Sequence, residues 1–512
     1  MIDHTSLIAD YGSPLYRYDL DVVDQARADL QAALPTGATV LYSLKANPHV
    51  DVVRALLAGG CHPELSSTGE LAVALEAGAD PAECFYTGPG KTAEEITTAL
   101  AAGVGTFSVE SITDLHRVAS VARALGRVVD CLLRVNGGEA PSGAGMRMTG
   151  EASQFGSDIE VLVERRAELS GAAVEGVNVV GFHFYPLTNA ADEAGLLAEL
   201  LGSIRTAARL RTELGLTVRL LDLGGGFACP FARAGERPRY TGLREPLEAE
   251  LDEHFAGWRD GDVRVFFESG RHLVGTSGTL FCTVSDVKDS RGARFTVLDT
   301  GINHLGGLSG IGRLLPLSAV PEPADESERS GVAEKVRLVG PLCTPADTLG
   351  RGAPELPAPY PGQVLAVPNV GAYGATASLI GFLSRPAAAE VAVRGDEVVS
   401  ATRLTLQRVA LTPLPEALVP ELTPTTEDDR GPWDDAYPEV LRSVLPRLAA
   451  PVGTGASLRA AGLDSLALVE LLVRLEDAYS VTIPDEALTP EAFETPASLW
   501  ETVTAARSAV SA

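Results

Sequence analysis

The stretch TVLYSLKANPHVDVVRALLAGG (39–60) contains a strand-like run followed by a helical pattern, and repetition of this strand–helix unit indicates the architecture of most of the chain. It opens with β-branched and aromatic residues and continues with apolar residues at three- and four-residue spacing, as in an amphipathic helix. Helical patterns such as 70–79 and 203–215 separate further strand-like runs. Eight strand–helix units over about 230 residues predict a (β/α)8 barrel, with a doubly wound open sheet as the alternative. The other seven strand-like runs lie at 62–67, 84–89, 105–111, 129–136, 179–185, 218–226 and 263–270.

The pattern changes after residue 276, because runs such as RFTVLDT (294–300) and GQVLAVPNV (362–370) follow one another without helices between them. This change predicts a second, all-β domain, which the early run PLYRYDL (14–20) is expected to join. Prolines and acidic residues then mark a linker before a mostly helical region. The expected divisions are an N-terminal segment joining the β domain (1–37), the barrel (38–275), the β domain (276–412), the linker (413–432) and a small helical domain (433–512).

The composition excludes several classes of protein. Apolar residues make up 45% of the chain and charged residues 21%, and no uninterrupted apolar run approaches the length of a membrane-spanning helix. The 68 acidic and 41 basic residues give a net charge of −27, which opposes binding to nucleic acid or to an anionic membrane. The six cysteines form no disulfide framework and no signal-peptide pattern is present, so we expect a cytoplasmic protein.

Lys45 is one of only four lysines, and it lies near the C-terminal end of the first barrel strand, where barrel enzymes place their chemistry. A lysine in an apolar strand is either a salt-bridged structural residue or a candidate nucleophile, and its position alone leaves both open. The other three lysines are Lys91, Lys288 and Lys335.

Two glycine-containing loops follow the last two barrel strands, where barrels commonly bind phosphate through backbone N–H groups. They contain Gly224-Gly225-Gly226 and Ser269-Gly270-Arg271, although a glycine triplet is also an ordinary turn. A lysine facing a phosphate site across the same barrel mouth suggests pyridoxal phosphate held as a Schiff base. Glu268 would then stand beside the pyridine nitrogen; its alternative role is that of a structural partner for an arginine.

Nine motifs, taken in order, resemble the fold-type III pyridoxal-phosphate decarboxylases, the family of diaminopimelate and ornithine decarboxylases. They extend over roughly residues 10–410. The resemblance implies an N-terminal barrel, a C-terminal β domain and a head-to-tail homodimer whose two active sites are each completed by the partner subunit. The motifs are YSLKAN, HPELSSTGEL, YTGPGK, LLRVN, QFGSD, LDLGGGF, ESGRHL, GPLCTPAD and GAYG.

The resemblance also implies roles for individual residues. Lys45 would bind the cofactor, and Glu268 would face its pyridine nitrogen. Cys343 would reach in from the other subunit and return a proton to the substrate carbon, although a lone cysteine is more often a buried small hydrophobe. No metal is expected. The remaining cofactor contacts would come from Gly224, Gly225, Gly226, Gly270, Arg271, Tyr373, Tyr185 and Thr188.

Two segments depart from the family members that act on free amino acids. Where those members read HxHxGS, this chain reads HFYPLT (183–188), so Tyr185 replaces the histidine expected to stack on the cofactor. Members that act on free diamines place an acidic residue at or near the position after the active-site cysteine, to hold a distal ammonium. Here Thr344 follows Cys343, and the first acidic residue is Asp347. Thr344 and Asp347 are the residues expected to face the substrate. Both departures resemble the subgroup that decarboxylates an aminoacyl group tethered to a carrier protein.

GLDSLALVELLVRLEDAY (462–479) predicts an amphipathic helix with Asp464 as its N-cap and Ser465 exposed in its first turn. Such a serine is by itself ordinary at a helix start. The sequence GLDSL in an acidic module of about 80 residues nevertheless resembles the acyl or peptidyl carrier proteins, which implies that Ser465 carries 4′-phosphopantetheine. The apolar face of the predicted helix comprises Leu468, Leu471, Leu472, Leu475 and Tyr479.

These features predict a pyridoxal-phosphate-dependent decarboxylase acting on an aminoacyl thioester of its own carrier domain, in natural-product or antibiotic biosynthesis. One alternative is a decarboxylase of a free amino acid whose carrier serves a later step. Another is a non-catalytic dimeric scaffold. Arg205, Arg209 and Arg211, on one predicted helix, form either a docking patch for the acidic carrier or a solvated face. The expected partners are a second copy of the chain, the carrier domain of the same or the partner chain, a phosphopantetheinyl transferase, an aminoacyl-loading ligase and a downstream acyltransferase.

Overall fold

The computed structural model divides into two compact units, Met1–Gln407 and Arg408–Ala512. None of the helices in its described part is long and apolar enough to cross a membrane. The described residues are 2–512 without 138–145, 148–152, 172–173, 307–317, 351, 411–430, 435, 446–447, 449–451, 459–460, 464, 480, 485–486, 488 and 511–512.

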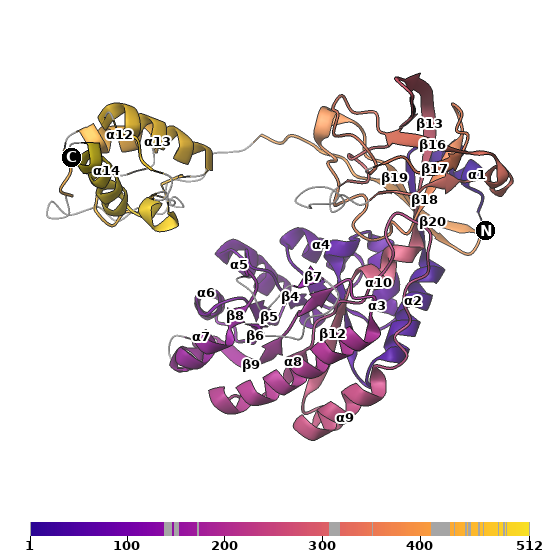
Figure 1. Cartoon of the computed structure of the whole chain (residues 1–512). Helices are drawn as coiled ribbons and strands as arrows, with labels where there is room; N and C mark the ends of the chain where they lie inside the picture. Colours follow the sequence, from indigo (N-terminus) through magenta and orange to yellow (C-terminus); the bar gives the residue numbers. More distant parts are fainter. Residues whose placement is uncertain are drawn as a thin grey trace. The chain divides into compact units, whose positions relative to one another are not determined.

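Eight parallel strands close into a barrel in the first unit (Figure 1). Each strand pairs with its neighbours, and the pairing of β12 with β2 completes the ring. The predicted barrel is therefore confirmed, and the open sheet is excluded. The strands are β2 (Thr39–Ser43), β3 (His62–Leu65), β4 (Phe85–Tyr86), β5 (Thr106–Val109), β6 (Val129–Asn136), β9 (Val177–His183), β11 (Leu220–Asp222) and β12 (Arg264–Ser269).

Helices follow the barrel strands and surround them (Figure 1). Their first turns are stabilised by capping side chains, because Ser67, Thr92, Ser111 and Asp192 each accept a backbone N–H of the helix that they precede. The earlier helix α2 (Leu20–Ala33) packs against α3. The barrel helices are α3 (Val50–Ala58), α4 (Thr68–Glu76), α5 (Ala93–Ala102), α6 (Ile112–Ala124), α7 (Ile159–Glu164), α8 (Glu193–Leu214), α9 (Arg244–His254) and α10 (Arg271–Val274).

A second sheet forms the β domain of the same unit. Its central strand β13 pairs with the N-terminal strand β1, which also pairs in parallel with β19, so the beginning of the chain lies inside this sheet. The helix α1 (His4–Tyr11) precedes β1. The strands are β1 (Leu15–Asp19), β13 (Gly278–Ser290), β14 (Ala293–Leu298), β15 (Glu322–Pro323), β16 (Ala333–Val339), β17 (Glu355–Pro357), β18 (Val364–Pro368), β19 (Ala389–Arg394) and β20 (Glu397–Arg403).

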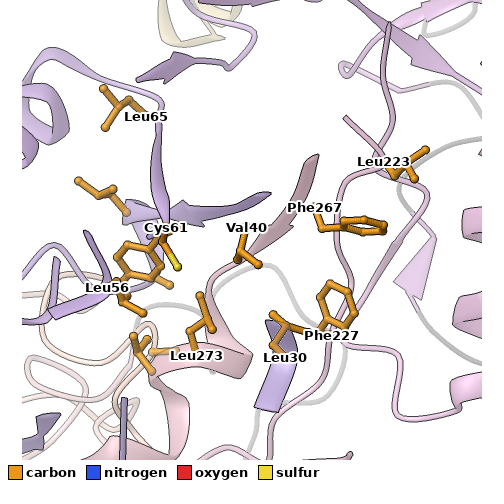
Figure 2. Close-up of a cluster of buried hydrophobic side chains, with 14 of the residues drawn as sticks. Leu30, Val40, Leu56, Cys61, Leu65, Leu223, Phe227, Phe267 and Leu273 are labelled. Atoms are coloured by element: carbon orange, nitrogen blue, oxygen red, sulfur yellow. The ribbon is translucent and has the colours of Figure 1, made fainter. Parts of the chain in front are cut away.

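The barrel strands have two apolar faces because each is covered on both sides. Alternate residues point outward into the layer between strands and helices, where Val40 of β2 and Phe267 of β12 lie near Leu30 of α2 (Figure 2). The other residues point inward and fill the bottom of the barrel. This interior plug consists of Leu41, Phe85, Leu132, Val180, Leu220 and Phe266, all at most 7% exposed.

The second unit is a small helical domain with its own core. It comprises α12 (Ala436–Val444), α13 (Ser465–Tyr479) and α14 (Pro496–Val510), with the short 3-10 helix Pro490–Phe493 before α14. Leu471 and Leu475 of α13 are fully buried, so the predicted apolar face is confirmed. The Tyr437 hydroxyl donates a hydrogen bond of 2.8 Å to the carbonyl of Pro496, which ties α12 to the start of α14.

We predict that Phe266→Ala destabilises the barrel strongly, because Phe266 is 0% exposed and its ring lies 4.7 Å from that of Phe85 inside the plug. Removing a buried phenyl group leaves a cavity, so the free energy of unfolding should fall by about 3–5 kcal/mol. Chemical denaturation of the full chain measures the loss. Phe382→Ala is the control, because Phe382 is 41% exposed and its replacement should change stability by less than about 0.5 kcal/mol.

Candidate active site

A layer of polar side chains lies in the barrel mouth above the apolar plug. Side chains alternate along a strand, so the residue two positions after an inward-facing residue also faces inward. Phe266 and Leu220 belong to the plug, and Glu268 and Asp222 therefore stand in the mouth. Arg134 follows the plug residue Leu132 in the same way. The chemistry of the barrel is thus positioned by the ends of several parallel strands.

Lys45 lies in a single 3-10 turn, Leu44–Ala46, directly after β2. Its Nζ donates to the Glu64 carboxylate of β3 at 3.3 Å, and it lies 6.0 Å from the centre of the Tyr185 ring. Burial lowers the pKa of Lys45, but the Glu64 and Glu268 carboxylates more than offset this and raise it above the usual value. The side chain is 44% exposed, so the amine is an accessible ammonium that Glu64 holds in the mouth.

Lys91 occupies a contrasting position. Its side chain is 1% exposed, its Nζ lies 2.7 Å from the Asp114 carboxylate, and it also donates to the carbonyl of Gly88. A buried ammonium with these partners is a structural ion pair. Of Lys45 and Lys91, it is Lys45 whose amine is accessible to a ligand.

The Gly224-Gly225-Gly226 loop packs too closely against its neighbours for any side chain. A Cβ at Gly224 would lie 2.1 Å from the carbonyl oxygen of Phe184, and a Cβ at Gly225 would lie 2.1 Å from that of Glu268. Gly224 also has a φ of +71°, which favours glycine. The loop therefore brings bare backbone to the end of the barrel, between the ends of β9 and β12.

Gly270, Arg271 and Tyr373 meet the lysine segment from two other parts of the chain. A Cβ at Gly270 would lie 2.8 Å from Cβ of Ala46, and the Tyr373 backbone N–H donates to the Ala46 carbonyl at 2.7 Å. The Arg271 guanidinium lies 5.0 Å from the centre of the Tyr373 ring. Tyr373 has a φ of +56°, a strained conformation that such close packing maintains. The β domain thus contributes to the rim of the barrel mouth.

Glu268 is 2% exposed, and its Oε1 lies 2.9 Å from Nε2 of His183, an ion-pair distance without hydrogen-bond alignment. Burial raises the pKa of Glu268, but His183 and Lys45 outweigh it and lower the pKa to about 2. Asp222 behaves in the opposite way, because burial and the Glu268 charge raise its pKa to about 8. Glu268 is therefore the ionised carboxylate of this pair.

Tyr185 and Thr188 follow β9. Burial raises the pKa of Tyr185 to about 12 despite the nearby Lys45 ammonium, so its phenol is neutral. Thr188 lies in the two-residue strand β10 (Leu187–Thr188), opposite Met146 of β7 (Met146–Arg147). The structure brings Tyr185 to Lys45, whereas it places Thr188 on this separate ribbon.

Cys343 lies in the β domain, on the loop between β16 and β17, and is the exposed one of the six cysteines. Asp347 closes this loop: one oxygen accepts the Ile302 N–H at 2.8 Å, the other accepts the Leu342 N–H at 2.7 Å, and the residue is 3% exposed. Asp347 therefore supports the Cys343 loop, a role different from the substrate contact expected of it. Thr344 lines a neighbouring pocket of about 710 Å³ together with Arg337 and Pro345.

Ser465 is the first residue of α13, in the separate helical unit. The predicted N-cap Asp464 lies outside the described residues. Three side chains in the mouth were not expected from the sequence: Glu64, His183 as a charged group, and Asp222. A carboxylate inside the strand-like run 62–67 was the available signal for Glu64.

The residues of the mouth fit pyridoxal phosphate. The cofactor needs an amine, an anion-binding cradle and a carboxylate for its ring nitrogen. Lys45 supplies an accessible amine, and the glycine loops with Arg271 form a cradle in which added Cβ atoms would clash. Glu268 is buried and its lowered pKa keeps it ionised, so it can accept a hydrogen bond from a protonated ring nitrogen.

Comparisons with known proteins match two parts of this chain. The family model described as "Pyridoxal-dependent decarboxylase, pyridoxal binding domain" matches residues 20–275, and the model described as "Phosphopantetheine attachment site" matches residues 439–503.

Similar proteins include the L-glutamyl-(BtrI acyl-carrier protein) decarboxylase of Niallia circulans, 27% identical over 76% of this chain and 91% of that protein. The diaminopimelate decarboxylase of Pseudomonas aeruginosa is 32% identical over 76% of this chain and 89% of that protein. The solved structure of diaminopimelate decarboxylase from Helicobacter pylori complexed with L-lysine gives a TM-score of 0.66 at 26% identity, over 77% of this chain and 95% of that one.

We predict that Lys45 is the lysine that carries the cofactor, because its amine is accessible and stands beside the glycine loops. Borohydride reduction of the purified holoenzyme, followed by peptide mapping, should place the cofactor on the Lys45 peptide. Lys91 provides an internal control, since its buried ion pair should leave its peptide unlabelled. A label on Lys91, Lys288 or Lys335 would show that the barrel mouth is not the cofactor site.

Proposed function

This chain belongs to the pyridoxal-dependent decarboxylase family, and from that premise we propose that its substrate is an aminoacyl group tethered as a thioester to its own carrier domain. The enzyme is a decarboxylase that uses pyridoxal phosphate and carries a domain for 4′-phosphopantetheine. A purely structural role for the barrel is thereby set aside. In the proposed reaction the free α-carboxylate leaves as CO₂ and the product remains on the carrier as an amine-terminated acyl thioester.

The observation that carries this proposal is the presence of both domains in one chain, residues 20–275 and 439–503. The similar protein from Niallia circulans is named for a glutamyl group carried by an acyl-carrier protein. By analogy, the carrier domain of this chain would present its aminoacyl group to the barrel. The domain also implies a phosphopantetheinyl transferase and a loading enzyme as partners.

The Cys343 loop supports a substrate without a distal ammonium. Thr344, Pro345 and Ala346 follow the cysteine, and both oxygens of Asp347 accept backbone N–H groups of the protein itself. Satisfied and buried, this carboxylate is not available to bind a substrate cation. A free diamino acid would therefore find no acidic anchor among residues 341–350 of this loop, whereas a tethered substrate needs none.

Pyridoxal phosphate, when bound, accepts the electron pair that the departing carboxylate leaves behind. In our proposal Lys45 holds the cofactor, and Glu268 keeps its ring nitrogen protonated. The Gly224–Gly226 loop, Gly270, Arg271 and Tyr373 bind its phosphate, and Tyr185 packs near its ring. The Cys343 thiol of a partner subunit then delivers a proton to the α-carbon of the substrate.

The tether, rather than charge attraction, is proposed to deliver the acidic carrier. Arg205 and Arg209 of α8 are paired with Glu250 at 2.6 Å and Glu213 at 3.7 Å, so the predicted arginine patch offers little free positive charge. Arg211 donates to the backbone carbonyl of His254. A covalent linker of about 20 residues instead gives an effective concentration on the order of mM.

Decarboxylation of a free amino acid is the second candidate. The diaminopimelate decarboxylase of Pseudomonas aeruginosa has a higher identity to this chain, 32%, than the carrier-dependent relative at 27%. In that case the carrier domain would serve a later step. The two candidates differ in whether Ser465 is needed for loss of CO₂.

We predict that Ser465→Ala abolishes decarboxylation of the aminoacyl group loaded on its own chain, because the phosphopantetheine arm has no other attachment point. The variant should still bind pyridoxal phosphate, since Ser465 lies in the other unit. CO₂ release from a separately loaded carrier domain added in trans is the positive control. Efficient CO₂ release from a free amino acid by Ser465→Ala would instead establish the second candidate.

We also predict that the active site is shared between two subunits. Lys45→Ala and Cys343→Ala should each be inactive alone, and mixing them should create heterodimers with one intact site. Recovery of up to about one quarter of wild-type activity is expected if subunits exchange at random. Mass spectrometry of differently tagged subunits verifies exchange, and exchange without recovered activity would rule the shared site out.

A further inference from the structure

A compact group of three titratable side chains lies behind the proposed cofactor site. His183 ends β9, Asp222 ends β11 and Glu268 lies in β12, and one nitrogen or oxygen atom of each lies within 4.8 Å of the other two. They are 1%, 1% and 2% exposed. Parallel pairing sets His183 directly beside Asp222 in the sheet register. The proposed function gives a role to Glu268 but none to the other two.

Two carboxylates at this separation cannot both remain charged in a buried site unless a cation compensates them. His183 is the group in position to do so, because its Nε2 lies 2.9 Å from Glu268 Oε1. Its Nδ1 lies 2.7 Å from the Ser108 hydroxyl, which can accept a second ring proton. Both ring nitrogens therefore face groups that can accept hydrogen bonds from an imidazolium.

The other charged groups nearby are already compensated. Arg134, the register partner of His183 on β6, lies 2.9 Å from Glu110, and Lys45 lies 3.3 Å from Glu64. Asp222 accepts the Gly224 N–H at 2.9 Å. The group of three is thus electrically balanced when His183 is positive, Glu268 is negative and Asp222 is protonated. The pKa directions agree, since burial lowers the pKa of His183 but the Glu268 charge more than offsets it.

We propose that His183 is a positioning residue of this decarboxylase, an imidazolium that keeps the Glu268 carboxylate ionised and fixed for the ring nitrogen of pyridoxal phosphate. This inference rests on the proposed role of Glu268. The positive charge of His183 would lie closer to the Glu268 carboxylate than to the ring nitrogen that this carboxylate binds. It therefore lowers the proton affinity of Glu268 more than that of the ring nitrogen. The proton between the two groups then stays on the ring nitrogen.

The test uses the full-length holoenzyme reconstituted with pyridoxal phosphate labelled with ¹⁵N in its ring, and the readout is the nitrogen chemical shift. The wild type should show a protonated ring nitrogen at neutral pH. In His183→Gln, an uncharged side chain that can still donate to Glu268, the resonance should move toward the unprotonated value. In the matched control Ser108→Ala, which loses only the Nδ1 contact, it should stay protonated. An unchanged resonance in His183→Gln would overturn the proposal.

Glu268→Gln separates this failure from failure of the proposed function. If the ring nitrogen stays protonated in Glu268→Gln as well, the role of Glu268 itself is wrong. Should His183→Gln fail to fold, ¹⁵N-histidine labelling of the wild type replaces it. The His183 signal is assigned as the histidine signal that moves in Ser108→Ala. In the wild type at neutral pH this signal must have the shifts of an imidazolium. A neutral-imidazole signal, or a stoichiometric divalent metal bound in the purified holoenzyme, would contradict the proposal.

Discussion

The alternation of side chains along the strands of a closed barrel is the constraint on which the site depends. A strand that sends Phe266 or Leu220 into the interior plug must send Glu268 or Asp222 into the mouth above it. Because all eight strands are parallel, their C-terminal ends meet at one end of the barrel. Lys45 and the two glycine loops arrive there from distant parts of the chain, and Tyr373 of the β domain closes the rim by its hydrogen bond to Ala46. Packing of the plug therefore also positions the layer of polar side chains in the mouth.

Burying so many ionisable groups is costly, and the mouth offsets this cost by pairing them locally. Lys45 stands with Glu64, Arg134 with Glu110, and His183 with Glu268, each at 2.9–3.3 Å. Removing one member of the two buried pairs, Arg134–Glu110 or His183–Glu268, leaves an uncompensated charge and typically costs about 3–5 kcal/mol. The pairs also hold each side chain in one place before any ligand arrives, which is the preorganisation that catalysis by electrostatic stabilisation requires. Asp222 is the one carboxylate of this group whose raised pKa leaves it protonated near neutral pH.

Features encoded locally could be predicted from the sequence, and those that depend on contacts between distant residues could not. The barrel follows from the repeating strand and helix patterns, and the helix that begins at Ser465 follows from its apolar spacing. The position of Lys45 left two interpretations open, because its partner Glu64 lies 19 residues away on the next strand. Asp347 was expected to face the substrate, yet its oxygens bind backbone N–H groups, one of them 45 residues distant. The alternation rule could have located Asp222 and Glu64, but only once the strand ends were known.

The barrel binds pyridoxal phosphate and the chain also contains a carrier domain, and we propose that CO₂ is lost from an aminoacyl group carried on the chain itself. Intact-protein mass spectrometry tests this most directly. The pantetheinylated chain is loaded with candidate aminoacyl groups, with Lys45→Ala loaded in parallel as the matched control. For one aminoacyl group, the mass of the wild-type chain should fall by that of one CO₂ while the Lys45→Ala chain keeps its full mass. If every loaded group keeps its full mass on the active enzyme while a free amino acid is decarboxylated, decarboxylation of a tethered substrate is contradicted.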